Sequence, residues 1–238
     1  TLTQGTDSRY MYWDQLLSIY SYLGEFEKMY RKGRKAIDEY DNRARIYLLT
    51  GVGALQMNKS DSAVLFLKEG IRHVDDDKSL RIQFYTQLGE AYHKIGNYPR
   101  SDHYFNKVLE IDSDNKLVLN NYSYYLSLRG EKLEKALKYS HKVIQEEPKN
   151  PIYLDTYAWI LYKMGRLRKA QKYIEKALQN GGMDDADIVE HYGDILYKRG
   201  DQQKAFEIWK KSKELGNPSN ELNYKLKHQS LPPKSDEK

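Results

Sequence analysis

The apolar residues of this chain recur at the spacing of an α-helix over most of its length. They fall at positions i, i+3, i+4 and i+7, which places them along one side of a helix. Strands have little support, because runs of Val, Ile and Thr are short and only 6 of the 238 residues are proline. The pattern therefore predicts an all-α protein whose helices each bury one face.

A turn residue returns at a nearly constant interval and indicates how these helices are organised. It stands at Gly24, Asn58, Gly96, Gly130, Gly165 and Gly200, at intervals of 34, 38, 34, 35 and 35 residues. Glycine suits a helix end because it reaches the left-handed conformation without strain. A slim residue that lets two helices approach follows five positions later, at Met29, Ala63, Ser101, Ala170 and Ala205, with Ala136 displaced by one inserted residue. The interval predicts stacked helix pairs that bury their apolar faces against their neighbours.

The intervals and residue types resemble the tetratricopeptide repeat, a helix-turn-helix unit of about 34 residues. The segment "YTQLGEAYHKIGNYPRSDHYFNKVLEID" carries Leu88, Gly89 and Tyr92 at matching positions, and Trp13 stands where the family has its signature tryptophan. The resemblance implies a right-handed α-solenoid with six repeats, which we place at 10–43, 44–77, 82–115, 116–150, 151–185 and 186–219.

The two ends of the chain depart from the repeat. We predict an N-terminal leader at 1–9, a capping helix at 220–229 and a disordered tail at 230–238. Ser219 or Asn220 would cap the last helix, because their side chains accept hydrogen bonds from free backbone N–H groups. The leader shows no comparable cap, which predicts further protein upstream.

Composition and charge narrow the function without naming it. The chain is 31% charged and 39% apolar, which suits a thin stack of helices better than a compact single-core enzyme. Lys and Arg exceed Asp and Glu by 39 − 34 = 5, too small an excess to require a polyanionic partner. The absence of cysteine excludes disulfides, thiolate metal sites and cysteine nucleophiles. It fits a reducing cytoplasm and a bacterial periplasm equally well.

The residue types of enzymes are present but are not arranged for chemistry. The six histidines form no metal-binding pair with carboxylate support, and neither a phosphate-binding loop nor a nucleophile elbow occurs. The segment "GVGALQ" at 51–56 is half of a dinucleotide fingerprint, but it lies inside a predicted helix. We therefore predict a non-enzymatic protein with no metal and no cofactor.

The most basic run, residues 31–47, raises the question of nucleic-acid binding. A nucleic-acid surface aligns Lys and Arg along one face and interleaves them with aromatic rings. Here Asp38, Glu39 and Asp41 interrupt the basic residues, and later repeats do not continue the run. We predict a solvated helix face and no nucleic-acid partner.

The resemblance also implies a binding surface. In this family the first helices of successive repeats line a concave groove for peptides or partner helices. The register maps ten candidate groove residues onto this chain: Glu90, His93, Asn120, Tyr124, Asp155, Trp159, Tyr162, Glu190, Asp194 and Tyr197. In "LDTYAWILYKMG" at 154–165 the helical register turns Tyr157 to the core and turns Trp159 and Tyr162 toward the groove.

One subfamily can be set aside. Chaperone-binding members grip a C-terminal carboxylate with Lys and Asn at fixed positions, where this chain has Thr86 and Glu90. The predicted groove also becomes acidic toward its C-terminal end, and that charge would repel a carboxylate.

The resemblance predicts a scaffold that binds a peptide or protein segment. The last three repeats resemble exported bacterial proteins, several of them outer-membrane lipoproteins that serve as adaptors. This favours a periplasmic or outer-membrane-associated envelope complex, with a lipid anchor possible upstream. No stretch reaches the roughly 20 apolar residues of a membrane-spanning helix. The alternative is a homo-oligomer, or a spacer in a larger chain.

Overall fold

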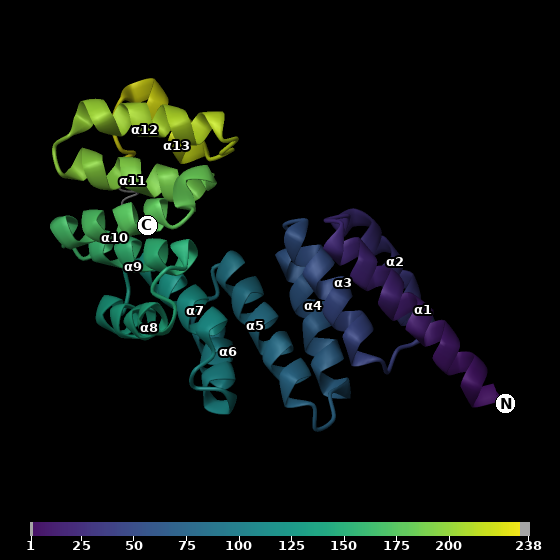
Figure 1. Ribbon diagram of the computed structural model, residues 1–238. Helices are drawn as coiled ribbons and strands as arrows, with labels where there is room; N and C mark the ends of the chain where they lie inside the picture. Colours follow the sequence, from purple (N-terminus) through teal and green to yellow (C-terminus); the bar gives the residue numbers. More distant parts are fainter. Residues whose placement is uncertain (1, 234–238) are drawn as a thin grey trace. The chain divides into compact units, whose positions relative to one another are not determined.

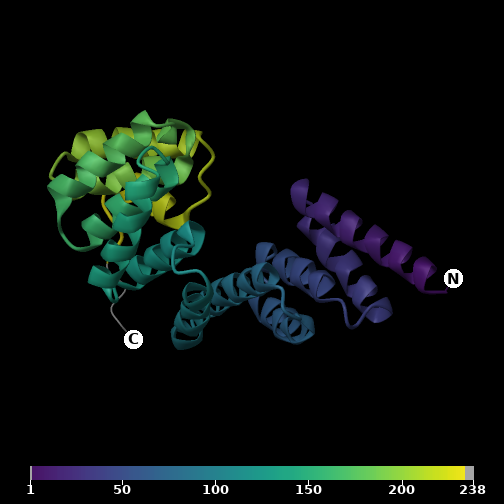
Figure 2. The same cartoon turned by 60° about the horizontal axis from the view of Figure 1, so that its bottom comes forward.

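The computed structural model describes the backbone of residues 2–233 and the side chains from Ser8 onward. In that part of the chain every regular element is a helix (Figures 1 and 2), which confirms the all-α prediction. The α-helices are α1 (Leu2–Tyr22), α2 (Phe26–Glu39), α3 (Ala44–Gln56), α4 (Ser60–Gly70), α5 (Lys78–Lys94), α6 (Tyr98–Ile111), α7 (Lys116–Arg129), α8 (Leu133–Glu146), α9 (Pro151–Lys163), α10 (Leu167–Gln179), α11 (Ala186–Lys198), α12 (Gln202–Glu214) and α13 (Asn220–His228). Two short 3-10 helices, η1 (Ile71–His73) and η2 (Gly182–Asp184), follow α4 and α10.

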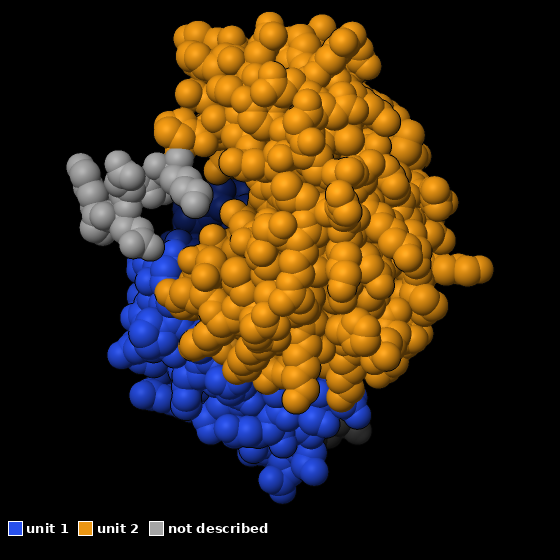
Figure 3. All heavy atoms as spheres, turned by 90° about the vertical axis from the view of Figure 1, so that its left-hand side faces the viewer, with its two compact units in different colours: residues 1–118 blue, residues 119–238 orange. Residues whose placement is uncertain are grey.

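The chain divides into two compact units, residues 1–118 and residues 119–238, coloured blue and orange in Figure 3. Unit 1 contains the pairs α1/α2, α3/α4 and α5/α6. Unit 2 contains most of α7 together with α8, the pairs α9/α10 and α11/α12, and α13. In unit 1 each helix from α1 to α5 packs against the next one, and in unit 2 each helix from α8 to α12 does the same, as a repeat array requires.

The turn and contact residues chosen from the sequence have the geometry that a helix pair needs. Asn58, the one turn residue that is not glycine, adopts the left-handed conformation with φ of 57°. Lys132, beside the inserted residue of the fourth turn, does the same with φ of 48°. All six slim residues are buried, from Met29 to Ala205, which confirms that these positions allow the paired helices to approach closely.

At the N-terminus, residues 2–9 of the predicted leader form the first turns of α1. Gly5 lies within these turns and does not interrupt the helix. At the other end Ser219 caps α13, because its side chain accepts a hydrogen bond of 3.1 Å from the backbone N–H of Leu222. Of the disordered tail predicted at 230–238, residues 234–238 lie outside the part of the chain that the structure describes.

The core follows the repeats. In unit 2, Leu154, Tyr157, Ala158 and Leu161 of α9 join one buried cluster with residues of α10 and α11. The assignment of Tyr157 to the core is therefore confirmed.

Candidate binding face of the C-terminal unit

Eight of the ten predicted groove residues belong to unit 2, where three first helices carry them. These are Asn120 and Tyr124 on α7, Asp155, Trp159 and Tyr162 on α9, and Glu190, Asp194 and Tyr197 on α11. The other two, Glu90 and His93, lie on α5 of unit 1, where the His93 ring lies 5.5 Å from the ring of Tyr98. The following description concerns unit 2 alone.

Three rings stack across α9 and α11. The indole of Trp159 lies 4.8 Å from the ring of Tyr162, at an interplanar angle of 20°. The same indole also lies 4.0 Å from the imidazole ring of His191, at an interplanar angle of 21°. Trp159 is therefore only 7% exposed, because α11 places the His191 ring over its indole. The helical register of α9 alone does not show this contact.

His191 is held from the opposite side by Asp155. Its Nδ1 lies 2.9 and 3.0 Å from the two carboxylate oxygens of Asp155, so Asp155 fixes the orientation of the ring. Burial lowers the pKa of His191, but the charge of Asp155, its hydrogen bond and the charges of Asp194 and Glu190 outweigh burial. The pKa is therefore raised above its ordinary value of 6.5.

The raised pKa of His191 makes the stability of the folded protein depend on pH in a definite direction. A raised histidine pKa means that the folded protein binds the proton more tightly than the unfolded chain does. The His191–Asp155 ion pair therefore contributes fully below the unfolded pKa, and its contribution is lost as the pH rises through the folded pKa.

We expect the urea midpoint of unfolding to fall as the pH rises above about 6.5. His191→Asn should flatten this dependence, because Asn retains a donor toward Asp155 but does not titrate. The exposed His103 of unit 1 provides the control, and His103→Asn should keep the slope of the wild type. Midpoints measured across this pH range test the prediction, and an equally steep profile for His191→Asn would contradict it.

The acidic end of the predicted groove is closed by α13. The ammonium group of Lys225 lies 2.5 Å from the Glu190 carboxylate and 2.8 Å from that of Asp194. The Asn217 amide donates to Glu190 at 2.8 Å, and the indole N–H of Trp209 donates to Asp194 at 2.9 Å. The protein's own side chains therefore already pair with the carboxylates of these two predicted groove residues.

Two buried polar atoms on this surface are left without a partner. Among the described residues no protein atom accepts a hydrogen bond from Nε1 of Trp159. Likewise none donates to Oδ1 of Asn120, a side chain that is also buried. The structure thus leaves one donor on α9 and one acceptor on α7 unsatisfied, at sites where such groups are normally paired.

The tyrosines of this surface remain neutral hydroxyls. Burial raises the pKa of Tyr124, and the nearby carboxylate of Asp155 raises it further. Burial and Asp194 act in the same direction on Tyr162. Tyr197 has a different role, since its ring stacks on Trp209 at 5.4 Å and so packs against α12. We define the inner face of unit 2 by the residues that remain: Asn120, Tyr124, Asp155, Trp159, Tyr162 and His191.

Sequence reasoning missed His191 and Lys225. His191 lies next to a mapped groove position rather than on one, so its ring gave no signal in the register. Lys225 did give a signal, because it lies on the apolar stripe of α13, three residues after the buried Leu222. A lysine on a buried stripe indicates a buried acidic partner.

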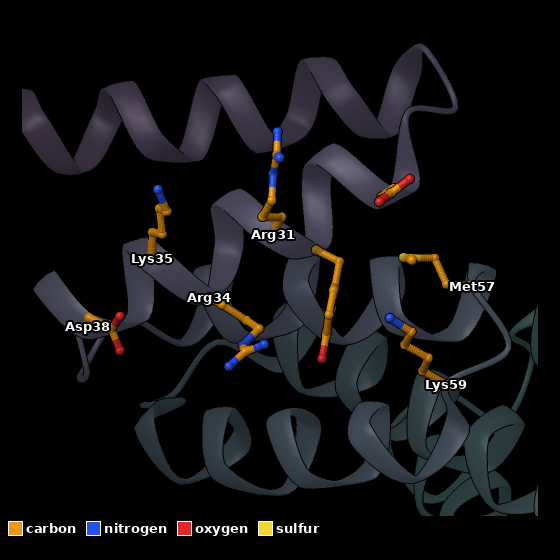
Figure 4. Close-up of a pocket in the computed structure, with 8 residues that line it drawn as sticks. Arg31, Arg34, Lys35, Asp38, Met57 and Lys59 are labelled. Carbon is orange, nitrogen blue, oxygen red and sulfur yellow. The ribbon is translucent and has the colours of Figure 1, made fainter.

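A hollow lies on unit 1, along the basic run identified in the sequence. Figure 4 shows Arg31, Arg34 and Lys35 of α2 around it, with Lys59 from the residue before α4. Arg31 and Lys35 point to one side of the hollow and Arg34 to the other. Because the cations do not converge on one point, this surface keeps the predicted role of a solvated helix face.

The described residues show neither a metal-binding cluster nor a membrane-spanning helix. No group of three or more His, Cys, Asp or Glu side chains is placed to hold a metal ion. None of the described helices is both long and apolar enough to cross a membrane.

Comparison with known proteins points in one direction. A family model described as "Tetratricopeptide repeat" matches residues 82–115 and 153–180. A TPR repeat-containing protein of Pseudomonas aeruginosa is 26% identical over 174 residues, which make up 71% of this chain and 28% of that protein. Another, from Methanocaldococcus jannaschii, is 28% identical over 125 residues, 52% of this chain and 22% of that protein.

The chain thus spans 28% and 22% of the lengths of these two relatives. A crystal structure of a tetratricopeptide repeat protein from Parabacteroides merdae shares the fold. Its TM-score is 0.76 at 17% identity, with 92% of this chain and 84% of that chain covered.

Proposed function

We propose that this member of the tetratricopeptide-repeat superfamily is a non-enzymatic adaptor that binds a protein segment on the inner face of unit 2. The fold of the superfamily supports protein-interaction scaffolds in general. The observation that carries this proposal is the pair of unsatisfied buried atoms, Nε1 of Trp159 and Oδ1 of Asn120. A peptide group offers the complementary acceptor and donor. Both atoms are buried in the unbound structure, so a ligand would satisfy them only if the side chains over them move aside on binding.

The rings around these atoms suit the same role. Tyr124 and Tyr162 are half-buried and keep neutral hydroxyls, so each offers apolar area together with a polar tip. Protein-binding energy concentrates in such aromatic residues when they are rigidly held. The Trp159–His191 stack and the Asp155 hydrogen bond supply that rigidity here.

The proposed surface is smaller than the groove predicted from the sequence. Glu190 and Asp194 pair with Lys225 and are removed from it, and Tyr197 packs against Trp209. The ligand would lie along α7 and α9, where Asp155 is already paired with His191 of α11 and the ammonium group of Lys163 lies 4.9 Å from the ring centroid of Trp159. A segment of low net charge that carries apolar side chains fits this surface best.

The finer proposal is that the complex lies in a bacterial envelope. It rests on the resemblance of the last three repeats to exported bacterial members of the superfamily. Fractionation of the source cells, with an antibody against the chain, tests it. Recovery with the outer membrane or periplasm is expected, and recovery in the cytosol would overturn this part alone.

A tryptophan substitution tests the binding face directly. Peptides are first selected from a displayed random library against the full chain, and the dissociation constant of the tightest synthetic peptide is then measured. We expect Trp159→Phe to weaken binding about tenfold, because it removes the N–H while keeping the ring. Trp13→Phe is the matched control, since the N–H of Trp13 is engaged by Glu39 on unit 1.

The three tryptophans also give three indole N–H signals by nuclear magnetic resonance. On addition of the selected peptide, the Trp159 signal should shift most. A peptide that shifts the Trp13 signal instead, or that binds Trp159→Phe with unchanged affinity, would place the binding surface elsewhere and refute the proposal.

A further inference from the structure

The positive charge of this chain is concentrated on the second helices of unit 2. Together α8, α10 and α12 carry 11 Lys and Arg residues against 5 Asp and Glu, an excess of 11 − 5 = 6. The first helices α7, α9 and α11 carry 4 of each kind. Since the net charge of the whole chain is +5, these three second helices account for its entire excess. Scattered charges are ordinary on a protein surface, but one sign gathered on one side creates a directed electrostatic field.

The lysines of these helices recur in the repeat register. Counted from the slim residue of each second helix, the position before it and the position six after it are lysine in all three helices: Lys135, Lys169 and Lys204, then Lys142, Lys176 and Lys211. The position two after it adds Lys138 and Lys172, and only Glu207 departs. These positions are three and four residues apart, so they lie on one side of each helix. Stacking of the repeats therefore arranges the lysines in rows across unit 2.

Helix α10 shows this side most clearly. Lys169, Lys172 and Lys176 are all exposed, and none of them forms an ion pair within the described part of the chain. The opposite side of the helix, which carries Ala170, is buried in the core cluster of unit 2. Glu175, the one acidic residue of α10, accepts hydrogen bonds from neutral groups of α10 and α11. The lysines of α10 therefore face solvent without a partner that balances their charge.

The chemistry of these cations favours an anionic phospholipid surface over a nucleic acid. Of the 11 basic residues 10 are lysine, which acts as a hydrated point charge, and only Arg168 could hold a phosphate with two parallel hydrogen bonds. A single-stranded nucleic acid also needs open rings on which its bases stack. The ring of Tyr173 is instead half-buried and lies 4.6 Å from that of Tyr157, and Tyr139 is half-buried too.

A lipid bilayer suits charges that lie in rows rather than around one point. Its headgroups move laterally, so they can gather under lysines that a rigid ligand would not contact together. Each lysine close to an anionic bilayer contributes to binding, and the contributions add along a basic surface. The large apolar side chains of α8, α10 and α12 are all at least partly buried. The contact would therefore rest on charge, without apolar groups that insert into the bilayer.

We propose that the second-helix side of unit 2 docks on a bilayer that contains anionic phospholipid, through the lysine rows of α8, α10 and α12. The contact is peripheral, with the ammonium groups over the lipid phosphates and with these helices outside the hydrocarbon core. The inner face of unit 2 is carried by first helices, so a docked molecule keeps it open to a protein segment. This docking goes beyond the proposed function, and either can fail without the other.

Flotation of the full chain with lipid vesicles tests this docking. The probes are vesicles of phosphatidylcholine alone and vesicles in which about one third of the lipid is anionic phosphatidylglycerol. At about 0.1 M salt we expect the chain to float with the anionic vesicles and not with the neutral ones. Raising the salt to about 0.5 M should release it, because screening shortens the reach of each charge.

A triple variant of α10 locates the contact. Lys169→Gln/Lys172→Gln/Lys176→Gln should lower partitioning onto the anionic vesicles about a hundredfold, since each lysine near the surface contributes a factor of about five. Its thermal midpoint should match that of the wild type, because the three side chains are exposed. The matched control removes the same charge from exposed lysines of unit 2 that lie outside its second helices. This control, Lys149→Gln/Lys198→Gln/Lys227→Gln, should change partitioning by no more than about threefold.

Three results would overturn the docking proposal. The α10 variant could partition like the wild type, or the control could lose as much, in which case net charge rather than this side of the molecule would account for binding. The chain could float equally well with neutral vesicles. It could also bind a single-stranded oligonucleotide more tightly than the anionic vesicles at equal phosphate concentration, which would assign the lysine rows to nucleic acid.

Discussion

Replacing Lys225 with Met is expected to lower the free energy of unfolding of unit 2 by about 3–5 kcal/mol. Lys225 is only 2% exposed, and its ammonium group neutralises two carboxylates that are themselves buried. Their charges raise the pKa of Lys225 against the lowering effect of burial, so the group stays charged. A methionine of similar length would fill the space but leave Glu190 and Asp194 without their cation. Uncompensated charge away from water is among the costliest defects in a protein.

Two comparisons separate this effect from general damage to α13. Lys227→Met changes an exposed lysine on the same helix, and its effect should stay within about 0.5 kcal/mol. The triple variant Lys225→Met/Glu190→Gln/Asp194→Asn removes all three charges and should recover much of the loss. Urea unfolding followed by circular dichroism gives the three values. A loss below about 1 kcal/mol for Lys225→Met would show that the buried ion pair contributes little.

The fold could be predicted because its determinants are local in the sequence. A turn residue that reaches the left-handed region and a slim residue five positions later recur in each repeat, and each can be recognised without knowing its neighbours. Even the irregular turns obeyed this logic, since Asn58 and Lys132 took the left-handed conformation. The repeat pattern does not say where the first helix begins, and the structure places the start of α1 at Leu2.

The candidate site could be predicted only in direction. A register assigns Trp159 and Tyr162 to the first-helix face because that depends on one helix alone. It does not say what the next helix places there, and His191, 32 residues after Trp159 (191 − 159), lies on the indole. The register likewise does not show the partner of the acidic end, because Lys225 comes from α13, 35 residues beyond Glu190.

The contacts made by His191 and Lys225 change which ligands would fit the proposed binding face. An open acidic groove would select basic ligands, whereas a groove whose acids are neutralised internally selects for shape and for peptide hydrogen bonds. The helix that supplies Lys225 also packs against α12.

Trp209→Ala is expected to cost about 3–5 kcal/mol, the second large effect. The indole is fully buried against α11, where Gly193 leaves room for it. A Cβ at residue 193 would lie 2.4 Å from the Cδ1 atom of this ring, so the ring rests on the helix backbone itself. Truncation would leave a cavity that α11 and α12 cannot close, and it would remove the hydrogen bond to Asp194. Phe206→Ala, on a partly exposed side chain of the same helix, should cost much less.

The same conservative change at two tryptophans isolates the indole N–H. Trp209→Phe keeps most of the apolar ring but leaves the buried Asp194 short of one donor, so we expect a loss of about 1–3 kcal/mol. Trp159→Phe removes an N–H that has no protein partner in the described chain, so stability should be unchanged or slightly higher. Thermal unfolding of the two variants side by side decides this. Equal losses would mean that the Trp159 N–H already contributes to the folded state, and the argument that it is kept for a ligand would fail.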